Sequence, residues 1–242
     1  MNLWRHIDDA KTKREALEAM ASDTPEQIAA KVVLYADAEE SVAKLKAASD
    51  VLLALELKGL KGSAHEAERA AIADQMMVHW HRGLKELRAF ADGLLKGRRT
   101  LHWPLAYPEI MGTEGFDAFV GNPPFLGGRR ISFRLSSDLL EYLKGWLLGP
   151  AGTTDLCVYF LLRAHILACR NGHVGLVVSD IVSQGESRTN GLEHLLANGS
   201  SIHVAVKSTD WPGEAGVKIA ILHLAKGDWL SLIHISEPTR PY

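Results

Sequence analysis

The chain has 242 residues, which is enough for one or two domains, each with a core of its own. Hydrophobic residues make up 47% and charged residues 23%, close to ordinary globular values, so the composition excludes wholesale disorder. The 27 basic and 29 acidic residues leave a net charge of −2, so any nucleic-acid contact has to come from local basic patches.

Neither the cysteines nor the histidines form a recognisable metal or disulfide pattern. Cys157 and Cys169 lie in one apolar stretch, and no H-E-x-x-H motif occurs. The most apolar stretch, which begins at Leu156, contains Arg163 and His165 and is too short to span a bilayer. No signal-peptide pattern opens the chain. The sequence therefore predicts a cytoplasmic protein with no metal site and no membrane partner.

Residues 1–100 are rich in Ala, Leu, Glu and Lys and predict a helical arm. Thr24 and Gln27 have the spacing of a capping box, and Pro25 stands in the first turn, where its missing N–H is not needed. The first long helix is therefore expected to begin at this point and to run to about Leu57.

Two glycines, Gly59 and Gly62, are expected to end this helix. Ser63 and Glu66 form a second capping-box pattern, which predicts another helix that continues to about Gly97. Two helices of about 33 residues, each roughly 50 Å long, would be joined by a tight turn. The arm is therefore predicted to be a long antiparallel helical hairpin.

In residues 101–229, short apolar strands alternate with helices, which is typical of an α/β fold. The predicted strands are Phe116–Val120, Val174–Ser179, Ile202–Val206 and an antiparallel Val217–Leu224, and the predicted helices lie within Ser137–Leu147, within Asp155–Arg170 and near Leu192–Ala197. Gly172 and Gly199 are expected to cap helix ends. The pattern predicts a largely parallel, doubly wound sheet covered by helices.

The segment Asn122-Pro123-Pro124-Phe125 directly follows the first predicted strand, so it lies at the carboxyl end of a strand, where open α/β folds bind ligands. A rigid turn is the alternative interpretation. The prolines have no N–H, so the Pro123 carbonyl can stay free, and the Asn122 side chain offers a second acceptor. Two acceptors suit a substrate –NH₂ group such as adenine N6, and they would favour its attack on an electrophilic methyl group. Phe125 offers a flat surface for an extruded base.

This motif and its flanks resemble the adenine-specific (N6) DNA methyltransferases of restriction–modification and phage-defence systems, especially the type IIG branch. The flanking matches are His102-Trp103-Pro104-Leu105, Pro108-Glu109-Ile110, Phe125-Leu126-Gly127-Gly128, Thr154-Asp155-Leu156, Gly175 to Ser179 with Gln184-Gly185, and Trp211-Pro212-Gly213-Glu214-Ala215. The resemblance covers about residues 100–229. It implies a protein of the prokaryotic cytoplasm that contains part of a Rossmann-like class I methyltransferase sheet, preceded here by the helical hairpin.

The resemblance also implies a function for the site. S-adenosyl-L-methionine would be the cofactor, double-stranded DNA the partner, and nuclease and target-recognition domains would be fused or associated. Asn122, Pro123, Pro124 and Phe125 would hold a flipped adenine. Trp211 is a candidate to close the other face of the base, and a core or lid role is the alternative for it.

The chain departs from the family pattern at the cofactor. The family binds S-adenosylmethionine through a Gly-rich turn after the first sheet strand, and no such strand, turn and helix precede Asn122. The nearest glycine-containing loop, Gly149-Pro150-Ala151-Gly152, lies downstream. We therefore expect residues 1–100 to be an inserted arm and residues 101–229 to be the catalytic half of a methyltransferase domain. On this interpretation the cofactor half precedes residue 1 and the fragment is inactive by itself; a split protein is the alternative.

The C-terminal residues 230–242 are expected to be a sequencing-adapter scar. Leu230 to Arg240 match an in-frame translation of a transposon-end adapter. Natural coding sequence is therefore expected to end near Trp229, which makes the chain a truncated piece.

Basic residues follow the motif closely. Arg129, Arg130 and Arg134 have no acidic residue among them, so Arg129 and Arg130 are candidate phosphate contacts; a solvated face is the alternative. Asp155 is interpreted as an acid that complements a helix dipole. Two other functions stay open: methylation of a protein glutamine amide or an RNA base, and a non-catalytic binding module whose helical arm docks a partner.

Overall fold

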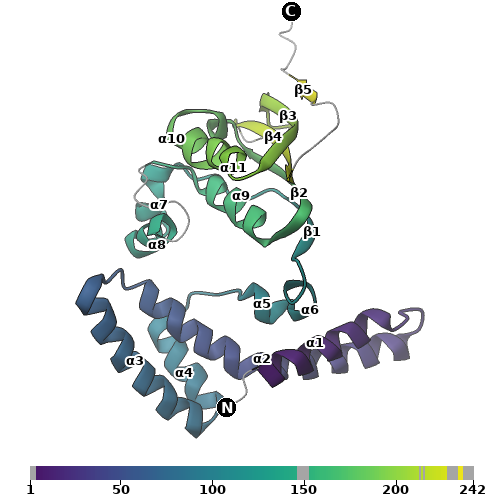
Figure 1. Cartoon of the computed structure of the whole chain (residues 1–242), viewed down its shortest axis with the longest axis vertical. Coiled ribbons are helices and arrows are strands. Elements are labelled where there is room, and N and C mark those ends of the chain that lie inside the picture. The colour runs from purple at the N-terminus through teal and green to yellow at the C-terminus, as the bar shows by residue number, and fades with distance from the viewer. Residues whose placement is uncertain (1–3, 146–152, 213, 215, 228–233, 237–242) are drawn as a thin grey trace, which may run out of the picture. The chain divides into compact units, whose positions relative to one another are not determined.

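The structure, a computed structural model, describes residues 4–145, 153–212, 214, 216–227 and 234–236. The chain divides into two compact units, Met1–Thr113 and Glu114–Tyr242. The described part of the first unit is helical, and the second unit contains a sheet with helices packed on it (Figure 1). The predicted α/β class is confirmed.

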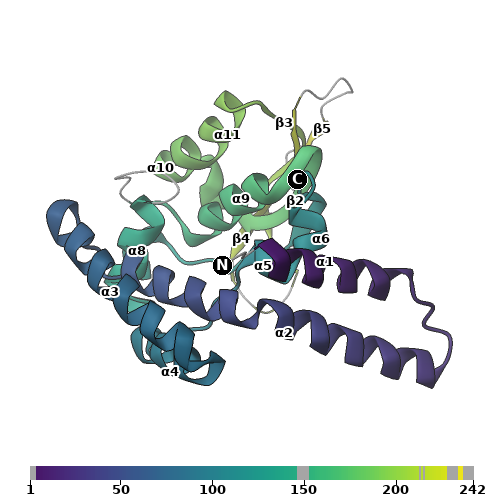
Figure 2. The same cartoon turned by 60° about the horizontal axis from the view of Figure 1, so that its bottom comes forward.

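The helices described in the first unit are α1 (Trp4–Ala19), α2 (Pro25–Glu56), α3 (Gly62–Arg82), α4 (Leu84–Leu95), α5 (Trp103–Ala106) and α6 (Pro108–Met111). The predicted start of α2 is confirmed. The Gln27 N–H donates to the Thr24 hydroxyl, the Thr24 N–H donates to the Gln27 side chain, and Pro25 opens the helix. Helix α1 runs alongside α2 (Figures 1 and 2).

The predicted second helix of the hairpin is wrong. Gly83 has a φ of 125°, a conformation that favours glycine, and it divides the expected helix into α3 and α4. Both of these helices contact α2, so the arm is a helical bundle and not a two-helix hairpin. The second capping box is also wrong, because α3 already begins at Gly62 and its N-cap, Lys61, has no side-chain hydrogen bond. Ser63 consequently lies inside the first turn.

One hydrophobic core joins these helices. Its fully buried members include Val51 and Leu55 of α2 and Leu87 of α4, together with the largely buried Trp80 of α3. Leu105 of α5 belongs to the same cluster. Residues 101–113, which the sequence pattern grouped with the second domain, therefore pack with the first unit.

A buried ion pair fixes the end of this unit. The Arg14 guanidinium donates to the Glu109 carboxylate at 2.7 Å, and the two side chains are only 15% and 5% exposed. The Arg14 guanidinium also lies over the rings of Tyr35 and Tyr107, 5.7 and 5.3 Å from their centroids. These contacts attach α6, and with it the segment that leads to the second unit, to α1 and α2.

The sheet of the second unit contains β1 (Phe116–Gly121), β2 (Ala168–Ser179), β3 (Ser200–Asp210), β4 (Lys218–Lys226) and β5 (His234–Ser236), in the order β1-β2-β4-β3-β5. Strands β1 and β2 are parallel, and β4 is antiparallel to both β2 and β3. The first three strands therefore run in one direction, with β4 reversed between two of them. The prediction of an antiparallel partner near residues 217–224 is confirmed.

The helices described in this unit are α7 (Gly128–Arg134), α8 (Ser137–Leu143), α9 (Leu156–Leu167), the short η2 (Asp180–Ser183), α10 (Gly185–Ser187), η3 (Arg188–Glu193) and α11 (His194–Ala197). Helix α9 ends at Leu167, three residues earlier than predicted, because β2 already begins at Ala168. Gly172 is therefore not a helix cap. It lies beside an irregularity in the β1–β2 register. Gly199, at φ 83° after α11, does follow a helix end as predicted.

Helices α9 and α11 cover one face of the sheet (Figures 1 and 2). Alternate residues of β2, Val174, Leu176 and Val178, pack there with Val158 and Leu161 of α9. Across the described ranges, no helix is long and apolar enough to cross a membrane.

Three histidines from neighbouring strands gather on the other side of β2, β3 and β4. The ring centroids of His173 and His203 are 5.4 Å apart, and those of His203 and His223 are 5.9 Å apart. Burial, together with the two neighbouring imidazoles, lowers the pKa of His203 below its ordinary value of about 6.5. Burial, Lys226 and His194 lower the pKa of His165 in the same way.

These lowered pKa values predict a loss of stability in acid. Because the unfolded chain binds a proton at His203 and His165 more readily than the folded chain does, the free energy of unfolding should fall as pH drops below about 6.5, and the fall should end below the folded pKa values. Each histidine contributes at most about 1.4 kcal/mol per pH unit to the slope of the free energy of unfolding against pH. Urea titrations at pH 5, 6 and 7.5 measure the slope, and His203→Gln should make it shallower. An identical slope in that variant would contradict the prediction.

Candidate functional site

The predicted motif lies where the sequence placed it. Strand β1 ends at Gly121, and residues 122–127 form the loop that leads to α7. Asn122 is exposed, and its side-chain amide makes no hydrogen bond to another residue in the described part of the chain. Pro123, the next residue, is buried. The Asn122 amide is therefore held at a strand end and is open to a ligand.

Phe125 is less open than expected. Its side chain is half-buried and packs against the core cluster formed by α9 and the sheet. Part of the ring is therefore held by the protein, and only the remainder can contact a ligand. This anchoring also fixes the direction in which the loop leaves β1.

The buried carboxylate of Asp155 organises the loop. It accepts a hydrogen bond from the Cys157 N–H at 2.9 Å as the N-cap of α9, and a longer one of 3.4 Å from the Leu126 N–H. The Leu156 N–H returns to the Leu126 carbonyl at 2.9 Å, and the Asp155 N–H donates to the Ser187 hydroxyl at 3.0 Å. Asp155 thus does more than complement a helix dipole, because it joins the motif loop to the start of α9.

Neighbouring residues extend this junction to the segment after β2. Thr153 donates both its N–H and its hydroxyl to Glu186, the latter at 2.6 Å, and these hydrogen bonds lower the pKa of that carboxyl group. The Asn190 amide donates to the buried Thr154 hydroxyl at 2.8 Å. Residues 153–155 therefore bind both the motif loop and residues 186–190. The Thr154-Asp155-Leu156 match indicated this segment, but its hydrogen-bond partners, about 30 residues away in the chain, could not be read from the sequence.

Trp211 lies at the same edge of the sheet as Asn122, because β1 and β3 run in the same direction and both residues follow strand ends. Three strand-to-strand spacings, roughly 14 Å at about 4.8 Å per spacing, separate β1 from β3 across the sheet. The register places Gly121 level with Ala205, so Trp211 also lies several residues farther along the strand direction than Asn122. The Trp211 N–H donates to the Val217 carbonyl at 3.0 Å, and the residue is half-buried. Gly213 and Ala215 of this match lie outside the described residues. Trp211 therefore lies at the same edge of the sheet as the motif, but it does not contact the motif.

Arg129 and Arg130 are both exposed on α7, which begins directly after the motif loop. Gly128, the first residue of the helix, is buried against the backbone of residues 153 and 154. The position of both arginines is therefore set by the same junction that fixes the motif loop.

The described residues do not form the cofactor cradle implied by the resemblance. Between Trp4 and Met111 all regular structure is helical, so no strand and glycine turn precede β1 there. The loop at 149–152 lies outside the described residues. Within the ranges that the structure describes, no group of three or more His, Cys, Asp or Glu side chains is arranged to hold a metal ion.

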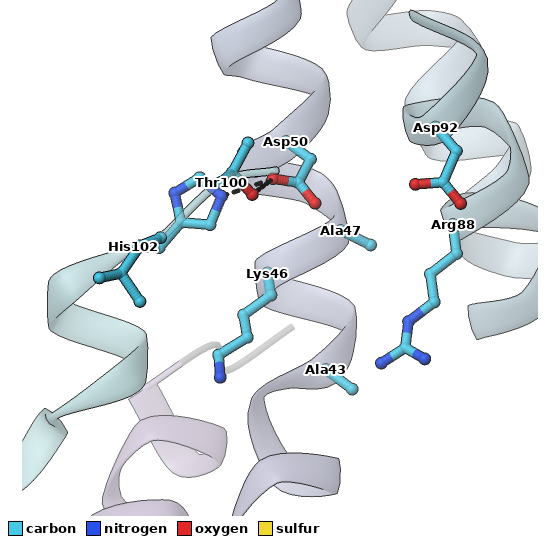
Figure 3. A pocket seen from close by; sticks show the side chains of 9 residues that line it. Ala43, Lys46, Ala47, Asp50, Arg88, Asp92, Thr100 and His102 are labelled. Atoms are coloured by element: carbon cyan, nitrogen blue, oxygen red, sulfur yellow. Dashed lines mark hydrogen bonds and ion pairs between the residues drawn. The ribbon is translucent and has the colours of Figure 1, made fainter. Parts of the chain in front are cut away.

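A polar pocket of about 260 Å³ lies in the first unit, between α2, α4 and the segment before α5 (Figure 3). Asp50 accepts hydrogen bonds there from the Thr100 hydroxyl at 2.5 Å and from His102 Nε2 at 2.7 Å. Arg88 and Asp92 line its other side from α4. Because Asp50 of α2 bonds to residues 100 and 102, it attaches the segment that follows α4 to α2. We interpret the cluster as structural.

Comparison with known proteins gives one family. The profile of the family described as "Eco57I restriction-modification methylase" matches residues 35–210 of the chain. A comparison with curated protein sequences finds no match.

The fold is similar to several solved structures. The type IIL restriction-modification enzyme MmeI, determined in complex with DNA, is 19% identical with a TM-score of 0.47 over 64% of this chain and 23% of that one. A class I S-adenosylmethionine-dependent methyltransferase, described as putative, from Listeria monocytogenes is 15% identical, with a TM-score of 0.41 over 65% and 47%. A modification subunit of a type I restriction enzyme, also described as putative, from Vibrio vulnificus YJ016 is 16% identical. Its TM-score is 0.38, over 64% of this chain and 33% of that one. The chain spans less than half the length of each.

Proposed function

The chain belongs to the Eco57I restriction-modification methylase family, and on that premise we propose that it supplies the base-binding half of a DNA adenine N6-methyltransferase. The observation that carries this proposal is the exposed Asn122 amide, held at the carboxyl end of β1 beside a buried proline. A rigid turn alone would not need an asparagine side chain open to solvent at the ligand-binding edge of the sheet.

The chemistry follows from the two acceptors. The Asn122 side-chain oxygen and the Pro123 carbonyl would each accept one N–H of the adenine amine. Binding both hydrogens directs the nitrogen lone pair away from the ring and stabilises the positive charge that develops on the nitrogen as it gains a methyl group. The accessible part of Phe125 would contact one face of the extruded base. Trp211, three strands away across the sheet, does not reach the other face of the base in this arrangement.

We assign S-adenosylmethionine as the methyl donor on family membership. Since the described residues do not form its cradle, the role given to this chain is to bind and orient the amine. On the same interpretation, residues 101–229 are the catalytic half and residues 1–100 an inserted arm, although residues 101–113 pack with the arm. Double-stranded DNA is the proposed partner, together with the nuclease and target-recognition domains of such systems.

The experiment is a methyl-transfer assay with the complete gene product that carries these residues. Labelled S-adenosylmethionine is supplied with duplex DNA, with RNA or with a glutamine-containing peptide, and the products are digested and identified by mass spectrometry. We expect N6-methyladenine in DNA, and we expect the 242-residue chain by itself to give none.

Each remaining candidate function gives a different product. Methylation of the peptide or of RNA alone would replace DNA as the substrate class. Absence of methylation on all three, together with failure to bind S-adenosylmethionine, would favour a non-catalytic binding module.

A further inference from the structure

Helix α7 has one buried face and one fully exposed face. Ile131 is completely buried and packs with Leu156 and Tyr159 of α9, while Gly128, one turn earlier, contacts the backbone of residue 153. These contacts hold the helix firmly on the second unit. The outer face is consequently presented to solvent in a fixed orientation.

An aromatic side chain stands on this outer face among arginines. Phe133 is 85% exposed, and Arg129, Arg130 and Arg134 are exposed around it. Because residues three and four apart are neighbours on a helix, Arg129 and Arg130 both lie beside Phe133. The Arg134 guanidinium lies 6.0 Å from the centre of the Phe133 ring. Burying such a ring in the core is the usual way to stabilise it, and this one is not buried.

The position of α7 relates this face to the motif. Six residues separate Asn122 from Gly128, which is a span of at most roughly 20 Å. Along a duplex that distance corresponds to about six base-pair steps. A nucleic acid whose base is held at Asn122 would therefore pass within reach of α7.

We propose that the outer face of α7 binds the DNA next to the extruded base, with Phe133 stacking on a neighbouring base and the three arginines contacting phosphates. This inference rests on the proposed function. Charge complementarity selects the occupant, since α7 has three arginines and no acidic residue of its own. One carboxylate, Glu186, interacts with Arg129, and this interaction, after the hydrogen bonds from Thr153, helps to lower the pKa of Glu186. An exposed aromatic among guanidinium groups is suited to stacking on a base whose face is free, beside a phosphate backbone, as surfaces that bind single strands do. In a duplex, extrusion of the adenine frees the faces of the bases next to it. The arginines would supply affinity and not sequence readout.

The test measures binding of the chain to a duplex of about 30 base pairs with one central mismatched adenine, by fluorescence anisotropy at several salt concentrations. Phe133→Ala should weaken binding about tenfold and leave the salt dependence unchanged, because stacking releases no counterions. Arg134→Ala should weaken binding and reduce the slope of log K against log salt by about one.

Matched controls come from the same unit. Phe160→Ala, at an exposed phenylalanine of α9, and Arg170→Ala, at an exposed arginine near the start of β2, should both bind like the original chain. If Phe133→Ala binds as tightly as Phe160→Ala, the role of α7 is overturned while the proposed function stands. If the complete gene product methylates peptide or RNA but not DNA, the proposed function fails, and this inference fails with it.

Discussion

Replacing Asn122 with alanine is expected to lower the rate of adenine methylation by at least about 10²–10³-fold, the usual effect of removing one positioned hydrogen-bonding group from a reacting centre. The amide is exposed and bonds to no other described residue, so its loss should leave the free energy of unfolding unchanged. The Pro123 carbonyl would remain as a single acceptor, unable to hold both hydrogens of the amine. The measurement is single-turnover methyl transfer by the complete gene product with saturating DNA.

DNA affinity separates a chemical role from a binding role for Asn122. Anisotropy should show binding within a few-fold of the original protein, because most DNA affinity comes from phosphate contacts. Asn198→Ala is the matched control. Asn198 lies just before β3, at the opposite edge of the sheet, and its amide bonds only locally, to the His194 carbonyl. Full activity in Asn122→Ala, or an equal loss in Asn198→Ala, would remove Asn122 from the amine site.

The parts of the fold that could be predicted are those with local signals. The Thr24 capping box specifies the start of α2 through contacts within one turn. The break at Gly83 could not be found in this way, because a single glycine in a helical pattern costs only about 1 kcal/mol relative to alanine and is often tolerated. The sequence does not reveal the boundary between α9 and β2, because residues 156–169 are apolar except for Arg163 and His165, so periodicity does not mark where the helix stops.

The same distinction applies to the site. The strand followed directly by Asn122 places the motif at the sheet edge without any knowledge of tertiary contacts. The second role of Asp155 depends on a contact with Leu126, 29 residues away in the chain, which has no local signature. Phe133 gives no pattern either, because one aromatic residue in a short helix is usually buried, and only its exposure in the structure makes it a candidate for binding.

The close packing between Gly128, the first residue of α7, and the backbone of residues 153 and 154 predicts a large effect from one added methyl group. In Gly128→Ala the new Cβ would lie 2.6 Å from the Thr154 carbonyl oxygen and closer still to the Thr153 carbonyl. Backbone atoms cannot turn aside as a flexible side chain can, so α7 or the start of α9 would have to move. We expect a loss of about 2–3 kcal/mol in the free energy of unfolding, the range of overpacking substitutions, measured by urea denaturation of the chain.

Gly127→Ala is the matched control for Gly128→Ala, because it makes the same chemical change at a neighbouring position with different surroundings. At Gly127 no atom lies within 4 Å of a built Cβ, and its φ of −53° suits alanine, so Gly127→Ala should be neutral or stabilise by about 0.4–1 kcal/mol. The contact between Gly128 and residues 153 and 154 positions both the motif loop and the outer face of α7. Gly128→Ala should therefore also weaken DNA binding, whereas Gly127→Ala should not. Equal stability of the two variants would show that residues 128 and 153 are not in contact, and the junction of α7 with residues 153–155 would then not position the motif loop.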